Sequence, residues 1–198
     1  MNDYSLRGHP RERWIYYIAA ATYAVMPFIV AIEGWLGLTI AIGTFLVFSL
    51  IFYFVDQFVW RFAAVRKLFR IPDLNGRWDC KGQQIGDNGA VIQEWTAEVT
   101  IKQTWTRISI AMNSGISRSR SGPASIEFDA GHGYRLLYNY MNEPKPGQDL
   151  HTHRGTCDLL FQGSCDSADG IYFNDHSRKS SGLITLTKTN LEGQNDGN

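Results

Sequence analysis

The stretch that decides the fold runs from Val91 to Gln103 and reads VIQEWTAEVTIKQ. Its odd-numbered positions include Trp95, Val99 and Ile101, while its even-numbered positions carry mostly glutamate, threonine and lysine. Successive side chains of a strand point to opposite faces, so this period of two predicts a β-strand with one buried face. A helix would instead need apolar residues at every third or fourth position.

The same alternation continues through the C-terminal part of the chain. Turn signals separate the alternating segments, among them Asp87-Asn88-Gly89 and Gly131-His132-Gly133. Because no helical period intervenes, we expect an antiparallel meander, which would lose its exposed edges by closing into a barrel. The sequence therefore predicts an all-β, roughly eight-stranded small β-barrel over residues 71–190, followed by a disordered tail over 191–198. The expected strands are Arg77–Gln84, Val91–Gln103, Thr106–Asn113, Ile116–Ser121, Ser125–Asp129, Tyr134–Met141, Gly155–Gln162, Gly170–Asn174 and Leu183–Lys188.

Two long runs without charged side chains precede the strands, at 14–32 and 35–55. A helix rises about 1.5 Å per residue, so each run covers roughly 28–32 Å, close to the thickness of a bilayer's hydrocarbon core. Only Glu33 and Gly34 separate the runs, and we expect them to form a tight turn. Residues 1–70 are thus predicted to be a membrane hairpin of two transmembrane α-helices, with an amphipathic connector over 56–70.

Basic residues flank both runs, whereas the turn carries Glu33 and no base. Because lysine and arginine remain on the cytoplasmic side, we expect both termini and the barrel to be cytoplasmic. Neither run contains an ionisable residue, which argues against an ion pathway through a single hairpin. The flanking bases are Arg7, Arg11 and Arg13 before the first run, and Arg61, Arg66, Lys67 and Arg70 after the second.

The composition excludes several functional classes. Lysine plus arginine and aspartate plus glutamate each total 19, so the formal net charge is zero and a DNA- or RNA-coating role is not expected. The chain has no Walker loop, Gly-x-Gly-x-x-Gly, His-Glu-x-x-His or Gly-x-Ser-x-Gly motif, so we expect no enzyme and no cofactor. His151 and His153 alternate without a nearby third ligand, and we expect no metal site. The three cysteines are expected to be reduced thiols.

Arginine and aromatic residues are mixed in the predicted strands. Arginine pairs with phosphate oxygens and aromatic faces stack on bases, so a barrel bearing both would suit a nucleotide with two phosphates. The alternative is that the arginines are solvated on the barrel exterior and the tyrosines belong to the core, and parity alone leaves open which face of the Arg118 strand points inward. The candidate ligand-binding residues, paired by shared parity, are Arg118 and Arg120, Tyr138 and Tyr140, Trp105 and Arg107, and Arg154 and Thr156.

The junction between the two parts reads Ile71-Pro72-Asp73-Leu74-Asn75-Gly76-Arg77-Trp78. Its Gly-x-Trp is similar to that of lipocalin-type barrels, in which the tryptophan closes one end, so a structural role is expected for Trp78. With two preceding spans, the Ile-Pro-x-Leu-x-Gly-x-Trp junction resembles that of the two-transmembrane β-barrel effectors of bacterial CBASS anti-phage systems.

This resemblance covers nearly the whole chain and carries several implications. It implies that the barrel binds a cyclic dinucleotide made by a partner CD-NTase. Ligand binding would then drive self-association and disruption of the inner membrane through contacts with its lipids, causing abortive infection. It also implies a location in the bacterial inner membrane.

Two other functions fit the residues alone. A membrane-tethered, lipocalin-like carrier of a hydrophobic ligand would have an apolar cavity. A non-enzymatic membrane adaptor would have a filled barrel interior that binds only protein partners.

Overall fold

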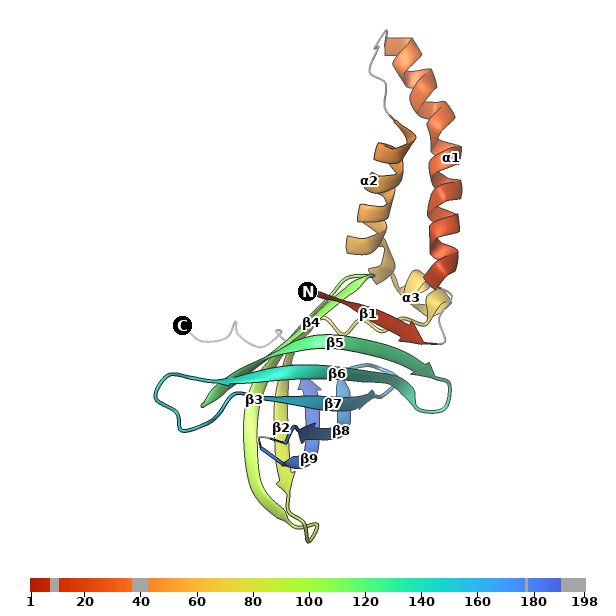
Figure 1. The fold of residues 1–198 in the computed structure, drawn as a ribbon. Coiled ribbons are helices and arrows are strands. Elements are labelled where there is room, and N and C mark those ends of the chain that lie inside the picture. The colour runs from red at the N-terminus through yellow and green to blue at the C-terminus, as the bar shows by residue number, and fades with distance from the viewer. Residues whose placement is uncertain (8–10, 37–42, 177, 190–198) are drawn as a thin grey trace, which may run out of the picture. The chain divides into compact units, whose positions relative to one another are not determined.

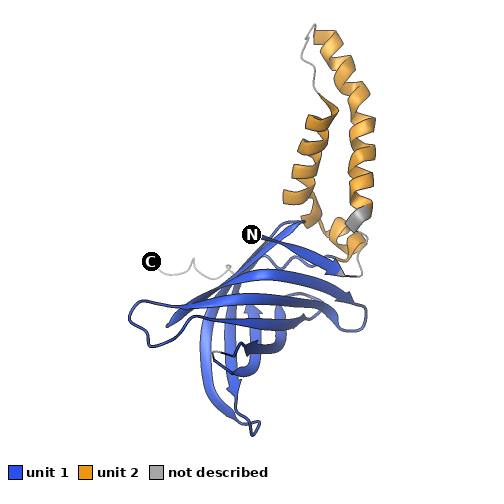
Figure 2. Ribbon diagram, in the orientation of Figure 1, with its two compact units in different colours: residues 1–8, 71–198 blue, residues 9–70 orange. Residues whose placement is uncertain are grey.

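The computed structural model describes residues 1–7, 11–36, 43–176 and 178–189. The chain divides into two compact units, one comprising residues 1–8 and 71–198 and the other residues 9–70 (Figure 2). The first unit contains the strands and the second contains the helices. The tail that the sequence predicts to be disordered lies outside the described residues.

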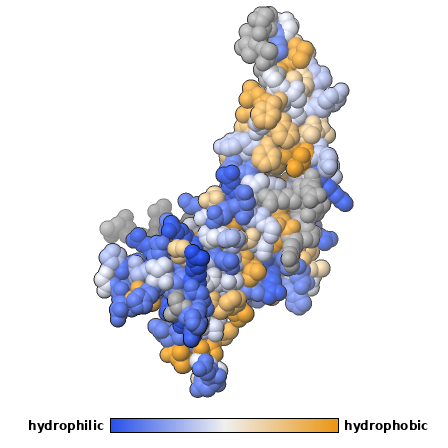
Figure 3. Space-filling view, viewed as in Figure 1, coloured by the Kyte–Doolittle hydropathy of each residue, from blue (hydrophilic) through white to orange (hydrophobic). Residues whose placement is uncertain are grey.

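The helical unit contains two helices that are long and apolar enough to cross a membrane, over Arg13–Leu36 and Thr44–Arg61. In Figure 3, apolar side chains cover much of this pair. Tyr23, Phe28 and Phe45 are among the most exposed large side chains of these helices. Exposed apolar surface of this extent suits contact with lipid. The elements are α1 (Arg11–Leu36), α2 (Thr44–Gln57), the 3-10 helix η1 (Val59–Arg61) and α3 (Ala63–Phe69), and α1 contacts α2 (Figure 1).

The turn between the two spans differs from the prediction. Glu33 and Gly34 are helical, since α1 continues to Leu36, and α2 begins only at Thr44 after an extended Gly43. Antiparallel helices are usually joined by a loop of about two to five residues, so the predicted turn of two residues is at the lower limit of this range. The expected start of the second span at residue 35 is therefore wrong, and residues 37–42 lie outside the described part of the chain.

The connector is not one continuous amphipathic helix. Phe58 (φ −128°) and Phe62 (ψ 133°) leave helical geometry and divide it into η1 and α3. Arg70 adopts left-handed geometry (φ 50°) and ends α3, and Pro72 prevents its continuation. Within this unit, the rings of Trp14 and Phe69 lie 4.2 Å apart and hold the end of the connector against α1.

The strand unit is the predicted antiparallel barrel. Each strand from β2 to β9 pairs with the next one along the chain, and β2 pairs with β9 to close the ring. The expected strands at 116–121 and 125–129 form one strand, interrupted by a register shift between Ser121 and Ala124. The strands are β1 (Asn2–Arg7), β2 (Gly76–Ile85), β3 (Val91–Gln103), β4 (Arg107–Ser114), β5 (Ser117–Asp129), β6 (Gly133–Pro144), β7 (His153–Phe161), β8 (Ser167–Asn174) and β9 (Ser181–Lys188).

The strand β1 was not expected from the sequence, which assigned its residues to the membrane hairpin. β4 and β5 pair directly only near Met112 and Ser119, and β1 fills the gap where they separate (Figure 1). It runs antiparallel to β4 and parallel to β5. Tyr4 is 3% exposed, accepts a hydrogen bond from Gln103 Nε2 (3.2 Å) and thereby joins the barrel core.

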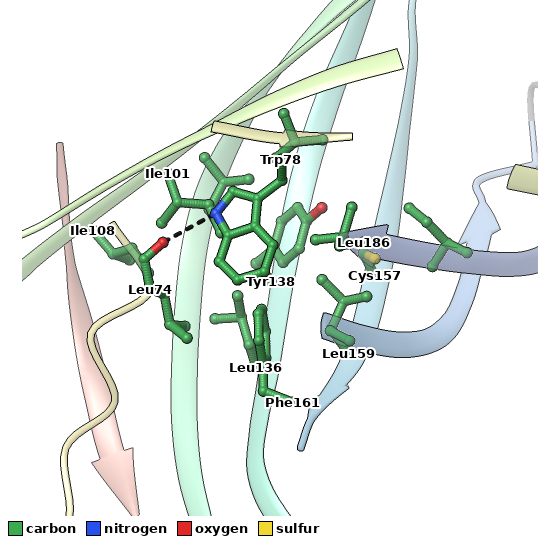
Figure 4. Close-up of a cluster of buried hydrophobic side chains, with 14 of the residues drawn as sticks. Leu74, Trp78, Ile101, Ile108, Leu136, Tyr138, Cys157, Leu159, Phe161 and Leu186 are labelled. Carbon is green, nitrogen blue, oxygen red and sulfur yellow. Dashed lines mark hydrogen bonds between the residues drawn. The ribbon is translucent and has the colours of Figure 1, made fainter. Parts of the chain in front are cut away.

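One end of the barrel is solidly filled. The indole of Trp78 is fully buried, donates to the carbonyl of Leu74 (3.2 Å) and meets the ring of Phe161 edge-on at 5.4 Å (Figure 4). Gln103 Oε1 accepts from the Leu74 amide (3.0 Å), so the junction is bound into the same core. The expected structural role of Trp78 is confirmed. Other side chains that fill this end are Ile101, Ile108, Leu136, Leu159 and Leu186.

Candidate ligand-binding cavity

The other end of the barrel contains a cavity of about 240 Å³. It lies where the β2–β3, β4–β5, β6–β7 and β8–β9 hairpins meet, away from the end that Trp78 fills. Three kinds of residue line the cavity: aromatic residues of its walls, a few small or medium polar residues, and an arginine from the β8–β9 turn. These lining residues are Trp95, Tyr138, Tyr140 and Tyr172; Ser117, Asn142 and His153; and Arg178.

Glycines leave room for the aromatic rings along the walls. Trp95 is paired across the sheet with Gly82, and Tyr140 is paired with Gly155. A Cβ on Gly82 would lie 2.1 Å from the Trp95 indole, and one on Gly155 would lie 2.4 Å from the Tyr140 ring, so each ring lies over its glycine. Because the rings lie along the wall, they leave the interior open. An aromatic residue opposite a glycine is a recurring device of β-sheets.

Hydrogen bonds fix the orientation of these rings. The Trp95 indole donates to the hydroxyl of Tyr172 (3.2 Å), and the Tyr140 hydroxyl donates to Asn174 Oδ1 (2.8 Å). Asn174 Nδ2 in turn donates to Ser180 Oγ (2.8 Å). The cavity walls are therefore ordered before any ligand arrives, which lowers the entropic cost of binding.

Two of the polar side chains, Asn142 (6% exposed) and His153 (4% exposed), face each other across β6 and β7. His153 Nδ1 lies 3.0 Å from the carbonyl oxygen of His151, and Asn142 Nδ2 lies 3.3 Å from His153 Nε2. Asn142 Oδ1 is buried and accepts no hydrogen bond from the described residues. One of the residues that line the cavity thus carries a buried acceptor without a partner.

Arg178 is the only lysine, arginine, aspartate or glutamate that lines the cavity among the described residues. Burial raises the pKa of the Tyr140 and Tyr172 hydroxyls, and the positive charge of Arg178 opposes part of this increase. An arginine beside aromatic faces can bind a phosphate group, since its N–H groups form a planar fork that matches phosphate oxygens.

Burial holds two tyrosine hydroxyls and one thiol of the cavity in their neutral forms. Burial raises the pKa of the Tyr138 and Tyr140 hydroxyls well above its usual value, and it raises the pKa of the Cys157 thiol to about 12. Tyr138 and Cys157 hydrogen-bond to each other. Near neutral pH these groups can donate hydrogen bonds but supply neither a thiolate nor a phenolate nucleophile. Cys80, Cys157 and Cys165 are free thiols.

Of the residues that the sequence proposed as ligand contacts, Tyr138 and Tyr140 line the cavity. Arg118 and Arg120 lie on the exposed face of β5, and Arg120 pairs with Glu143 at 2.8 Å. The inward face of this strand carries Ser117 and Ser119 instead.

The remaining candidates also lie away from the cavity. Arg107 is exposed and pairs with Asp3 at 3.5 Å, and Trp105 is buried in the turn between β3 and β4, at the filled end. Arg154 and Thr156 line a groove of about 460 Å³ on the outside of the barrel, together with Arg120 and Tyr140. This groove shares Tyr140 and Asn174 with the cavity. The structure therefore brings four of the eight candidates to the outer groove and two to the cavity, and Tyr140 belongs to both.

Sequence reasoning missed three polar residues of the cavity. Asn142 shares its parity with Tyr138 and Tyr140, so the period of two could have found it. His153 was considered only as a metal ligand, and the described residues contain no group of three or more histidine, cysteine, aspartate or glutamate side chains that could hold a metal. Arg178 lies beyond the end of a strand, where parity gives no information.

A closed antiparallel barrel with an ordered, partly polar cavity belongs to the class of small ligand-binding β-barrels. Residues 69–188 match the family model described as "Cap15, cyclic dinucleotide receptor domain", and the chain belongs to this family. It is also 37% identical, over 134 residues, to CD-NTase-associated protein 15 of Yersinia aleksiciae. That match covers 67% of this chain and 63% of the relative, so it spans less than two thirds of the relative's length. The resemblance to the CBASS effectors is thereby confirmed.

Proposed function

We propose that the protein is a membrane-anchored receptor for a cyclic dinucleotide, produced by a partner CD-NTase, and that the ligand binds at the cavity. The observation that carries this proposal is the combination of aromatic walls with Arg178 in a barrel of this family. A base can stack on the tyrosine and tryptophan rings, while the guanidinium pairs with a phosphate.

The two candidate spans support a location in the inner membrane. Because basic residues flank both spans and the segment between them contains none, both termini face the cytoplasm. The barrel then meets a messenger made inside the cell. No catalytic step is required, since binding alone conveys the signal.

The output that we propose is self-association followed by membrane disruption and abortive infection. A single apolar hairpin is stable in lipid, but packed copies bring many hairpins into one membrane area. The ligand can drive this assembly only by binding the assembled form more tightly than the single protein.

The cavity favours this function over the two alternatives. A carrier of a purely hydrophobic ligand has no use for an unpaired Asn142 oxygen or for Arg178, because buried polar groups without partners weaken apolar binding. An adaptor with a filled interior is disfavoured by the cavity itself.

The test is calorimetry with the full chain in lipid nanodiscs and a panel of 3′,3′-linked cyclic dinucleotides. The Arg178→Ala variant should bind about 10- to 150-fold more weakly, the loss expected for a hydrogen bond to a charged group. Arg77→Ala is the matched control, because this arginine is exposed on β2 and lies 3.9 Å from Glu98. Absence of binding heat from the unmodified chain with every ligand would contradict the proposal.

A further inference from the structure

The size of the cavity limits how much of a cyclic dinucleotide can enter it. Pockets that enclose a whole small-molecule ligand have volumes of roughly 300–1,000 Å³, and an engineered cavity of about 150 Å³ in another protein binds benzene. A cavity of about 240 Å³ lies between these values and fits a one- or two-ring base, without its sugar and phosphates. We infer that the cavity admits a single nucleobase and that Asn142 Oδ1 accepts a hydrogen bond from an N–H group of that base.

The Asn142 amide has one orientation when His153 is neutral. The carbonyl oxygen of His151 can only accept, so His153 Nδ1 carries the proton that joins them. His153 Nε2 then has a lone pair and accepts from Asn142 Nδ2. The two nitrogens of the ring thus direct the amide so that Oδ1 is the atom left without a partner.

Leaving this oxygen unpaired is costly in the absence of a ligand. A buried acceptor without a hydrogen bond loses its interaction with water and gains nothing in return. Asn142 is 6% exposed and lines the cavity beside Tyr138 and Tyr140. A base stacked on these rings, with an N–H group directed at Oδ1, would satisfy the acceptor. Asn142 is therefore a specificity-determining residue for the proposed ligand.

The second nucleoside then remains outside the cavity, so only one of the two bases is read. This inference rests on the proposed function and makes a quantitative prediction that a symmetric site would not share. If one base is read, a mixed dinucleotide binds nearly as tightly as the homodimer of the preferred base, with at most a twofold statistical loss. If both bases were read equally, its affinity would be the geometric mean of the two homodimers.

The first experiment measures the affinity of the full chain in nanodiscs for the four homodimeric 3′,3′-linked cyclic dinucleotides of adenine, guanine, cytosine and uracil. The mixed dinucleotide of the tightest and the weakest bases follows. We expect the mixed ligand to bind within about twofold of the tightest homodimer. An affinity at the geometric mean, or equal affinities for all four homodimers, overturns the inference while the proposed function stands. No binding by any of the five overturns both.

The second experiment tests the acceptor. Asn142→Leu keeps the shape of the side chain but removes the oxygen, and it should weaken the preferred ligand by about 5- to 150-fold, the loss for a buried donor without a partner. The preference among bases should fall by the same factor. Asn142→Asp keeps an oxygen at this position and should retain the preference. If Asn142→Leu does not fold, as judged by its thermal melt, Asn142→Ala replaces it. Unchanged preference in the variants without the acceptor, or its loss in Asn142→Asp, overturns the role of Asn142.

Discussion

The two ends of the barrel are made from the same eight strands of the meander, yet one is solid and the other is hollow. At the filled end, inward positions carry large apolar residues such as Trp78, Phe161 and Leu136, which pack against one another. At the hollow end, the aromatic residues face glycines, so Trp95 and Tyr140 lie over the neighbouring strand rather than across the interior. Side-chain size opposite each aromatic therefore decides whether the barrel is filled or open.

The largest effect is expected at the filled end. Trp78→Ala should lower the free energy of unfolding of the strand unit by about 3–5 kcal/mol, because a fully buried ring and its hydrogen bond to Leu74 are lost. Denaturant unfolding followed by tryptophan fluorescence of the remaining indoles measures this. A loss below about 1 kcal/mol would show that this end is not tightly packed around Trp78, which would contradict the contrast between the two ends.

The stability of the strand unit at alkaline pH depends on two buried thiols, Cys80 and Cys157. Burial raises the pKa of Cys80 and Cys157 from 9.0 to about 12, so between these values the folded chain holds protons that the unfolded chain has lost. Stability should therefore be complete below pH 9 and fall as the pH rises, by about 1.4 kcal/mol per pH unit for each thiol. Unfolding measured at pH 8 and pH 10 should show a smaller loss in Cys157→Ser. An identical loss in that variant would contradict the shift.

Adding one methyl group at Gly82 should reduce the volume of the cavity at the hollow end. Gly82→Ala places Cβ 2.1 Å from the Trp95 ring, which must move toward the cavity. We expect a stability loss of about 1–3 kcal/mol and at least a tenfold loss of ligand affinity. Gly163→Ala is the control, since no atom lies within 4 Å of its Cβ position. Unchanged affinity in Gly82→Ala would show that the ring does not border the ligand site.

The smallest effect is expected outside the barrel. Arg118→Ala and Arg120→Ala should leave ligand affinity within about twofold, because both side chains are exposed on β5, away from the cavity. Removing the exposed Arg120–Glu143 pair should change stability by at most about 1 kcal/mol. Calorimetry with the same ligand panel measures both variants. A tenfold loss in Arg120→Ala would instead place the ligand in the outer groove with Arg154 and Thr156, and a tenfold loss in Arg118→Ala would contradict a site inside the barrel.

The same contrast explains how far the sequence could predict the structure. Where one face is apolar and the other polar, as in β3, the alternation identifies both the strand and its buried face. In β5 serine alternates with arginine, so both faces are polar and only the pairing of Ser119 with Asn142 shows which one points inward. Arg178 lies in a turn that no period describes. β1 has six residues and a weak pattern, and it becomes a strand only because β4 and β5 separate beside it.

That short first strand has a topological consequence. The helical hairpin is inserted into the sequence of the barrel, between its first strand and the remaining eight, and all nine strands belong to one sheet. Both attachment points must therefore emerge on the same side of any bilayer that the helices traverse, so the number of crossings is even whatever the flanking charges. Proteolytic removal of the N-terminal helix, as in the processing of a secretory signal sequence, would also remove the strand β1 from the sheet. The strand unit is therefore not contiguous in sequence, because the helical unit interrupts it directly after β1.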